Sequence, residues 1–167
     1  VIIGPVGSGK TVLANTFSNK LCEKLEGIRD IIIARINCRN YSRTMQVLQR
    51  IATTLDPRHP ERGFSSGEII QTIRRNLLSH KKHLILILDE VDVLVRNDSA
   101  DLIYRILRID EGREERGTVS LIMISQEANI MSRFEAAIIS RLGLSNLLKL
   151  NPYNEKQLVD IARQRAE

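Results

Sequence analysis

The sequence contains no tryptophan, and its three phenylalanines and three tyrosines make up only 4% of 167 residues. Because unpaired bases are bound largely by stacking on aromatic rings, the chain has few platforms for single-stranded nucleic acid. It also lacks any apolar run near the roughly 20 residues that a membrane-spanning helix needs. No secretory signal is visible. We therefore expect no membrane partner, and nothing in the sequence directs the chain out of the cytoplasm.

Cysteine is scarce as well, with Cys22 and Cys38 the two thiols in the sequence. A chain with no other sign of secretion keeps such thiols reduced, so we expect two free cysteines rather than a disulfide. The histidines His59, His80 and His83 do not form a metal-binding set with these thiols. We interpret the last two as part of a solvated turn rather than as a ligand pair.

What the chain does contain is ordinary globular composition, 43% hydrophobic and 27% charged, at a length that suits one domain. The net charge of +5 is compatible with nucleic acid, but it is mild for this length and identifies no partner. The first residues have the character of the last part of a strand, with no initiating methionine. The chain also stops inside a helical pattern at 155–165, so we expect it to be truncated at both ends.

Short apolar runs alternate with longer helical stretches along the chain, which indicates a parallel α/β sheet. We expect strands at residues 1–3, 31–37, 83–88, 118–124 and 147–150. We expect helices at residues 10–25, 42–55, 67–79, 99–110 and 130–140. The strand segments are nearly continuous in Val, Ile and Leu, as expected for strands covered on both faces. Residues 56–66, with two prolines, are predicted to form an exposed loop.

Near its start the chain fits the phosphate-binding loop pattern G-x-x-x-x-G-K-[ST]. The matching residues are Gly4, Pro5, Val6, Gly7, Ser8, Gly9, Lys10 and Thr11. Glycines allow successive N–H groups to face one point, and a helix beginning at Lys10 adds the positive end of its dipole. We expect Lys10 to reach the β- and γ-phosphates of ATP and the Thr11 hydroxyl to bind Mg²⁺. The strand before the pattern and the helix after it favour phosphate binding over a plain turn.

The third apolar run ends in two acids, Asp89 and Glu90. A buried strand that ends this way places both carboxylates at the carboxyl edge of the sheet, beside the phosphate loop. We expect Asp89 to hold Mg²⁺ through water and Glu90 to polarise the attacking water as the general base. The alternative is a strand followed by a polar turn, which the phosphate loop makes the weaker interpretation.

A small basic cluster lies around the end of the third expected helix. Its members are Arg74, Arg75, Lys81 and Lys82. Such runs are usually the solvated face of a helix, so we interpret the cluster in this way and assign no partner to it.

The phosphate loop and the acidic pair are together typical of AAA+ ATPases. The extended segment 88–92, Leu-Asp-Glu-Val-Asp, is similar to the archaeal and eukaryotic replication-initiator family. Members of that family include origin recognition complex subunit 1 and cell division control protein 6. Further stretches agree with the resemblance, namely residues 36–38, residues 140–144, and Pro152 and Tyr153 with Gln157, Leu158 and Arg165. The likeness covers essentially the whole chain.

The resemblance implies roles for two more polar residues. In AAA+ proteins the strand after the acidic one ends in a polar residue that positions the attacking water, here Gln126; a capping loop at Ser125 is the alternative. The family usually has Asn at this position, so the longer Gln126 side chain puts the rate of hydrolysis in question. Arg141 resembles an arginine finger, which would reach the γ-phosphate bound by a neighbouring subunit. The alternative is a surface arginine near a helix C-terminus.

The resemblance also implies the architecture. We expect the α/β P-loop AAA+ fold, with a five-stranded parallel sheet between helices in the order 5-1-4-3-2. Residues 1–152 would form the nucleotide-binding core and residues 153–167 the start of a helical lid. Tyr153 and Arg165 match lid positions that contact the bound nucleotide. Residues 56–79, which include an extra helix, correspond to the DNA-contacting insertion of initiators.

From these features we expect an ATP-hydrolysing replication initiator that uses ATP and Mg²⁺. ATP would order the core and lid, support binding to duplex origin DNA together with other AAA+ initiator subunits, and help to load the replicative helicase. Such a protein works in the cytoplasm, on the nucleoid, in a prokaryote and in the nucleus in a eukaryote. One rival is a clamp loader or another DNA-remodelling AAA+ ATPase. A second is a nucleotide-holding scaffold with little turnover, for which Gln126 is the only support.

Overall fold

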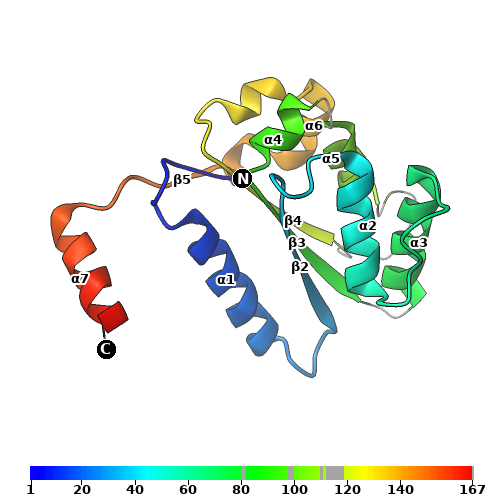
Figure 1. The fold of residues 1–167 in the computed structure, drawn as a ribbon, viewed down its shortest axis with the longest axis horizontal. Helices are drawn as coiled ribbons and strands as arrows, with labels where there is room; N and C mark the ends of the chain where they lie inside the picture. Colours follow the sequence, from blue (N-terminus) through cyan, green and yellow to red (C-terminus); the bar gives the residue numbers. More distant parts are fainter. Residues whose placement is uncertain (80–81, 98–99, 110, 112–118, 167) are drawn as a thin grey trace.

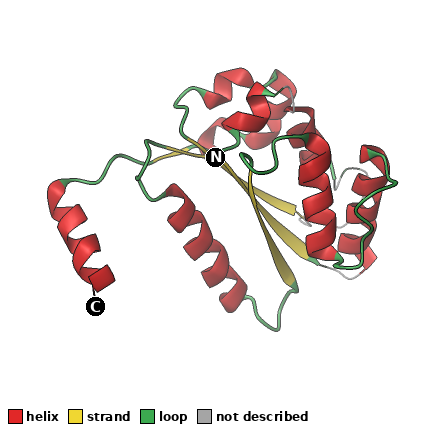
Figure 2. Cartoon of the chain, viewed as in Figure 1, coloured by secondary structure: helices red, strands yellow, loops and turns green. Residues whose placement is uncertain are grey.

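A parallel sheet lies between helices on its two faces (Figure 1; Figure 2). The computed structural model describes residues 1–79, 82–97, 100–109, 111 and 119–166. The elements are β1 (Ile2–Ile3), α1 (Lys10–Lys24), β2 (Ile31–Asn37), α2 (Thr44–Leu55), α3 (Ser66–Ser79), β3 (His83–Asp89), α4 (Asp92–Arg96), α5 (Ala100–Leu107), β4 (Val119–Ser125), the 3-10 helix η1 (Ile130–Arg133), α6 (Ala136–Leu142), the 3-10 helix η2 (Leu144–Asn146), β5 (Leu148–Lys149) and α7 (Glu155–Ala166). None of the described helices is long and apolar enough to cross a bilayer.

The sheet runs in the order β2-β3-β4-β1-β5, and every described strand pair is parallel. This confirms the expected order, read from the opposite edge. The register pairs Asn37 with Asp89 and Ile3 with Ser125. The carboxyl ends of the strands therefore meet along one edge of the sheet, where parallel α/β folds place their ligands.

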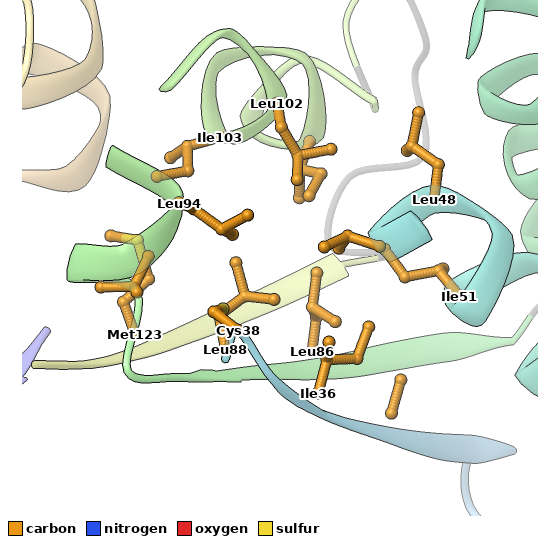
Figure 3. Close-up of a cluster of buried hydrophobic side chains, with 14 of the residues drawn as sticks. Ile36, Cys38, Leu48, Ile51, Leu86, Leu88, Leu94, Leu102, Ile103 and Met123 are labelled. Atoms are coloured by element: carbon orange, nitrogen blue, oxygen red, sulfur yellow. The ribbon is translucent and has the colours of Figure 1, made fainter. Parts of the chain in front are cut away.

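Strand β3 is covered by helices on both faces, which explains its continuous apolar sequence. Leu86 and Leu88 belong to the large core cluster under α2 to α6, while Ile85 and Ile87 belong to the smaller cluster under α1. All four are exposed by 2% or less. In Figure 3 the side chain of Leu88 points toward Leu94 of α4, and that of Leu86 points to the same side of β3. Burying each such side chain contributes about 1.5–3 kcal/mol, so β3 forms the centre of the fold and holds its carboxyl end in place.

The segment 130–140 differs from the single helix that its sequence predicts. It forms η1, an extended break at Phe134 with ψ 144°, and then α6. Ile130, Phe134 and Ile138 are all buried in the main core. A continuous helix would follow the local pattern, but burial of the Phe134 ring in the core favours the break.

Other boundaries also differ from the sequence prediction. The short helix α4 was not predicted, and β3 runs one residue further than expected, to Asp89. The loop 56–66 is mostly exposed, but His59 is only 7% exposed, with its ring centroid 5.3 Å from that of Phe64. Residues 99, 110 and 118, where we expected element ends, lie outside the described residues.

Candidate functional site

The turn between β1 and α1 has a backbone that only glycine adopts readily. Gly7 has φ 78° and Gly9 has φ 82°, both in the left-handed region. Gly9 is the N-cap residue of the 15-residue helix α1. The Ser8 hydroxyl and its N–H both donate to the Pro5 carbonyl, at 2.8 and 3.4 Å. The loop therefore holds its own curled shape in front of a helix N-terminus, which is the arrangement that binds anions.

Lys10 lies within this curl. The residue is 8% exposed, and its Nζ donates to the carbonyl oxygens of Gly4 at 2.8 Å and Pro5 at 2.7 Å. Both contacts are with neutral backbone groups, so the ammonium group has no carboxylate partner within the part of the chain that the structure describes. A phosphate oxygen is a stronger acceptor for this charge than a carbonyl.

A cleft of about 790 Å³ opens in front of the loop at the carboxyl edge of the sheet. It is lined by Val6, Gly7, Gly9, Lys10, Thr11, Val12, Asp89, Glu90, Ile124, Ser125, Gln126, Tyr153, Leu158, Ile161 and Gln164. Nine of the predicted site residues are among them. Gly4, Pro5 and Ser8 are not; they shape the loop from behind through the contacts with Lys10 and with one another.

The two acids at the end of β3, Asp89 in the strand and Glu90 just after it, have different partners. Asp89 Oδ2 accepts a 2.7 Å hydrogen bond from the Thr11 hydroxyl, so the two predicted magnesium ligands are in direct contact. Glu90 is the one described non-glycine residue with positive φ, at 56°. Its carboxylate forms an ion pair with Arg39, which follows the end of the neighbouring strand β2. Sequence reasoning missed Arg39; its place just beyond the strand that pairs with β3 was the available signal.

The acids also affect Cys38, which is fully buried beneath the site. Burial, together with the negative charges of Asp89, Asp92 and Glu90, raises the pKa of this thiol to about 12. Cys38 is free, as is the half-buried Cys22. The thiol of Cys38 is therefore a small apolar group in this structure and not a nucleophile.

The end of β4 completes the wall of the cleft with Gln126. The preceding residue, Ser125, is buried, donates a 3.0 Å hydrogen bond to Asp92 Oδ1 and accepts one of 3.0 Å from the Glu127 N–H. Both interpretations of this turn are thus compatible with the geometry, because Ser125 organises the turn and Gln126 lines the cleft beside it.

The far side of the cleft comes from Tyr153 and α7. A Cβ atom added to Gly9 would lie against the Tyr153 hydroxyl and 3.3 Å from its Cζ atom, so this tyrosine packs directly over the loop. Leu158, Ile161 and Gln164 of α7 add an apolar and amide surface. Arg165 belongs to α7 by its backbone, and its side chain lies outside the described part of the chain.

Comparison with known proteins identifies the family to which this site belongs. A family model described as an AAA domain matches residues 1–134. The chain belongs to the AAA domain family. The expected likeness to replication initiators is confirmed by curated relatives: an ORC1-type DNA replication protein of Desulfurococcus amylolyticus is 32% identical over 168 residues, and ORC1-type DNA replication protein 3 of Saccharolobus solfataricus is 33% identical over 173. Each match covers 100% of this chain but only 42% and 41% of the relative, so the chain spans about two fifths of their length.

Solved structures agree with this assignment. The ORC1 protein of Aeropyrum pernix, solved in complex with DNA, superposes with a TM-score of 0.85 at 29% identity. The match covers 99% of this AAA domain and 43% of the ORC1 chain. The five-stranded sheet and its strand order are therefore those of an initiator-type AAA domain.

Arg141 lies away from the cleft of this AAA domain. We expected it to follow a helix, but it lies in the last turn of α6. Its guanidinium forms an ion pair with Glu111 and lies 5.8 Å from the centre of the Tyr104 ring. The Arg141 side chain is 36% exposed, so it is available at the surface but engaged within its own subunit.

The basic cluster is not uniformly solvated. Arg74 Nε donates to the Ile109 carbonyl at 2.6 Å, and its Nη2 donates to the Glu111 carbonyl at 3.1 Å. The prediction of a solvated face is therefore wrong for Arg74, because it caps the chain that leaves α5. Arg75 is exposed as predicted, and Lys81 lies outside the described residues.

Proposed function

We propose that this AAA domain binds ATP with Mg²⁺ and hydrolyses it, as the nucleotide-dependent switch of a replication initiator. The observation that carries the proposal is the convergence of four separate segments on one cleft: the phosphate loop, the acids after β3, Gln126 after β4, and Tyr153 before α7. No two of these segments are neighbours in sequence. A convergence of this kind of polar group on one cleft is the general mark of a site.

The residues present fit the nucleotide and its metal. The curled loop presents N–H groups and the ammonium of Lys10 to phosphates. The Thr11 hydroxyl donates to Asp89 Oδ2 at 2.7 Å, so the two residues that would hold Mg²⁺, Asp89 through water, lie side by side. Bound Mg²⁺ would neutralise negative charge on the phosphates.

Hydrolysis requires a base and a group that positions the attacking water. Glu90 is assigned as the base and Gln126 as the positioning amide, since both line the cleft beside the loop. The ion pair with Arg39 holds the Glu90 carboxylate toward β2, so it must loosen before that carboxylate can polarise a water at the γ-phosphate. Arg141 would act at the site of a neighbouring subunit, after leaving Glu111.

The wider role rests on the relatives. The ORC1-type relatives are DNA replication proteins, and the Aeropyrum pernix ORC1 protein has been solved with DNA. By analogy, residues 1–152 are the nucleotide-binding core, and residues 153–167 begin a lid that contacts the bound nucleotide through Tyr153 and Arg165. Origin duplex DNA, other AAA+ initiator subunits and the replicative helicase are the proposed partners. The 56–79 segment is the proposed DNA-contacting insertion.

Two substitutions separate binding from chemistry. Lys10→Ala removes the main positive charge from the phosphate loop and should weaken ATP binding at least about tenfold. Glu90→Gln keeps size and hydrogen bonding but removes the base, so ATP should still bind while turnover collapses. The measurements are an ATP titration with Mg²⁺ and phosphate release by the intact protein.

Lys20 and Glu23 of α1 provide control substitutions of matched type. Lys20→Ala removes an equal charge from the exposed face of α1, and Glu23→Gln neutralises an exposed carboxylate near its end. Both should behave as wild type. Equal ATP affinity of the Lys10→Ala and Lys20→Ala proteins would overturn the nucleotide-binding proposal, and undiminished turnover by Glu90→Gln would overturn the assignment of the base.

A further inference from the structure

A closed ring of hydrogen bonds surrounds the turn that carries Gln126. Asp92 is the first residue of α4 and is 7% exposed; Ser125 is the last residue of β4 and is fully buried. The Ser125 hydroxyl donates to Asp92 Oδ1 at 3.0 Å and accepts from the Glu127 N–H at 3.0 Å. The one hydroxyl therefore joins α4 to the residues on both sides of Gln126.

Arg96 closes the ring from the other side. It lies one turn along α4 from Asp92, and its Nη2 is 3.4 Å from Asp92 Oδ2. Its Nε donates to Glu127 Oε1 at 3.0 Å. The second oxygen of Glu127 pairs with Arg133 Nε of η1 at 2.9 Å. Both carboxylates of the ring are thus neutralised by arginines, and the buried Asp92 carries no uncompensated charge.

The ring lies between the two groups that act on the attacking water in the proposed function. Glu90 precedes Asp92 by two residues, and the Glu90 carbonyl accepts from the Val93 N–H at 3.0 Å in the first turn of α4. The Val91 N–H donates to the Ile124 carbonyl at 3.0 Å, which ties the same turn to β4. Glu90, Ser125 and Gln126 line the cleft, whereas Asp92 does not, and the Ser125 hydroxyl is engaged with Asp92 and the Glu127 N–H. Asp92 can therefore influence chemistry only through its neighbours.

A buried carboxylate at position 92 requires an explanation. Two apolar side chains of similar volume in place of Asp92 and Ser125 would pack together at a lower cost of desolvation. A closed ring of directional hydrogen bonds favours one geometry where apolar contacts tolerate several. We propose that Asp92 and Ser125 are positioning residues for ATP hydrolysis, which together set the position of Glu90 relative to Gln126. The proposal rests on the assignment of Glu90 and Gln126 in the proposed function.

The test compares turnover, ATP affinity and thermal unfolding in the intact protein. Ser125→Ala removes the shared hydroxyl with little change in volume, and Asp92→Asn removes the charge that faces Arg96. Since a misplacement of about 1 Å can reduce rate roughly a hundredfold, each should reduce turnover by about ten- to a hundredfold, with ATP affinity within about twofold of wild type. The double substitution should cost no more than the more severe single one, because both disrupt the same ring of hydrogen bonds. Ser125→Thr keeps the hydroxyl and should retain most of the turnover.

Two controls make the outcome decisive. Asp101→Asn breaks the exposed ion pair of Asp101 with Arg105 on α5 and should leave turnover unchanged. Glu90→Gln tests the proposed function separately. If this substitution left turnover unchanged, the assignment of Glu90 as the base would fail, whereas the ring of hydrogen bonds would still be present. The positioning role is refuted if Ser125→Ala and Asp92→Asn lower the unfolding temperature but leave turnover per folded molecule intact. Loss of ATP affinity in parallel with turnover would also refute it, because the ring would then support binding.

Discussion

The close packing of Tyr153 on the phosphate loop leads to a prediction about Gly9. Alanine at this position would have to keep φ near 82°, a left-handed conformation that costs a residue with a Cβ about 1–2 kcal/mol. The new methyl group would also lie against the Tyr153 hydroxyl. Because that hydroxyl is the far end of a side chain, it can move aside cheaply, and the displacement takes Tyr153 out of its place in the cleft wall.

Gly27 provides a matched control for the backbone cost. It has φ 76°, and a Cβ added there meets no atom within 4 Å. Gly9→Ala and Gly27→Ala should therefore lose a similar free energy of unfolding, about 1–2 kcal/mol each, in urea denaturation. Only Gly9→Ala should weaken ATP binding in a titration, by at least about tenfold, which corresponds to roughly 1.4 kcal/mol.

A second substitution isolates the contact with Tyr153. Gly9→Ala combined with Tyr153→Phe removes the hydroxyl that the methyl would meet, so part of the lost ATP affinity should return. Tyr153→Phe alone keeps the ring and measures the contribution of the hydroxyl itself. If Gly9→Ala bound ATP as tightly as Gly27→Ala, the loop and Tyr153 would not form the nucleotide site. If the double variant gained nothing, the loss would come from the loop backbone and not from Tyr153.

The remaining predictions concern Arg141 and Cys38. Mixing intact Glu90→Gln protein with intact Arg141→Ala protein, each inactive alone, should restore part of the ATPase activity, because some interfaces then pair an unaltered site with an unaltered arginine. Absence of recovery despite demonstrated co-assembly would make Arg141 a surface arginine held by Glu111. Cys38 should resist iodoacetamide at pH 8 in the folded chain while the half-buried Cys22 reacts, since burial and three nearby carboxylates raise the Cys38 pKa to about 12. Mass spectrometry after brief labelling checks this, with both thiols reactive in denaturant; rapid native labelling of Cys38 would show that its surroundings open readily.

Much of this site was predictable from short stretches of sequence. The phosphate loop needs glycines where φ is positive, and Gly7 and Gly9 are found there. The acidic pair follows an unbroken apolar run because β3 is buried on both faces and ends at the edge of the sheet where the cleft opens. In each case the information is local, since a backbone conformation or a run of buried side chains is specified by the residues that adopt it.

The contacts that connect the segments of the site were decided by the tertiary structure. Arg39 reaches Glu90 only because β2 pairs with β3, and Arg141 reaches Glu111 only because α6 packs beside α5. The break at Phe134 goes against a helical pattern because burial of its ring in the core outweighs local propensity. Sequence periodicity specifies which face of an element is buried, but it carries no information on the partner that covers that face. Strand order and packing supply that partner, and hydrogen bonds such as Ser125 to Asp92 follow from it.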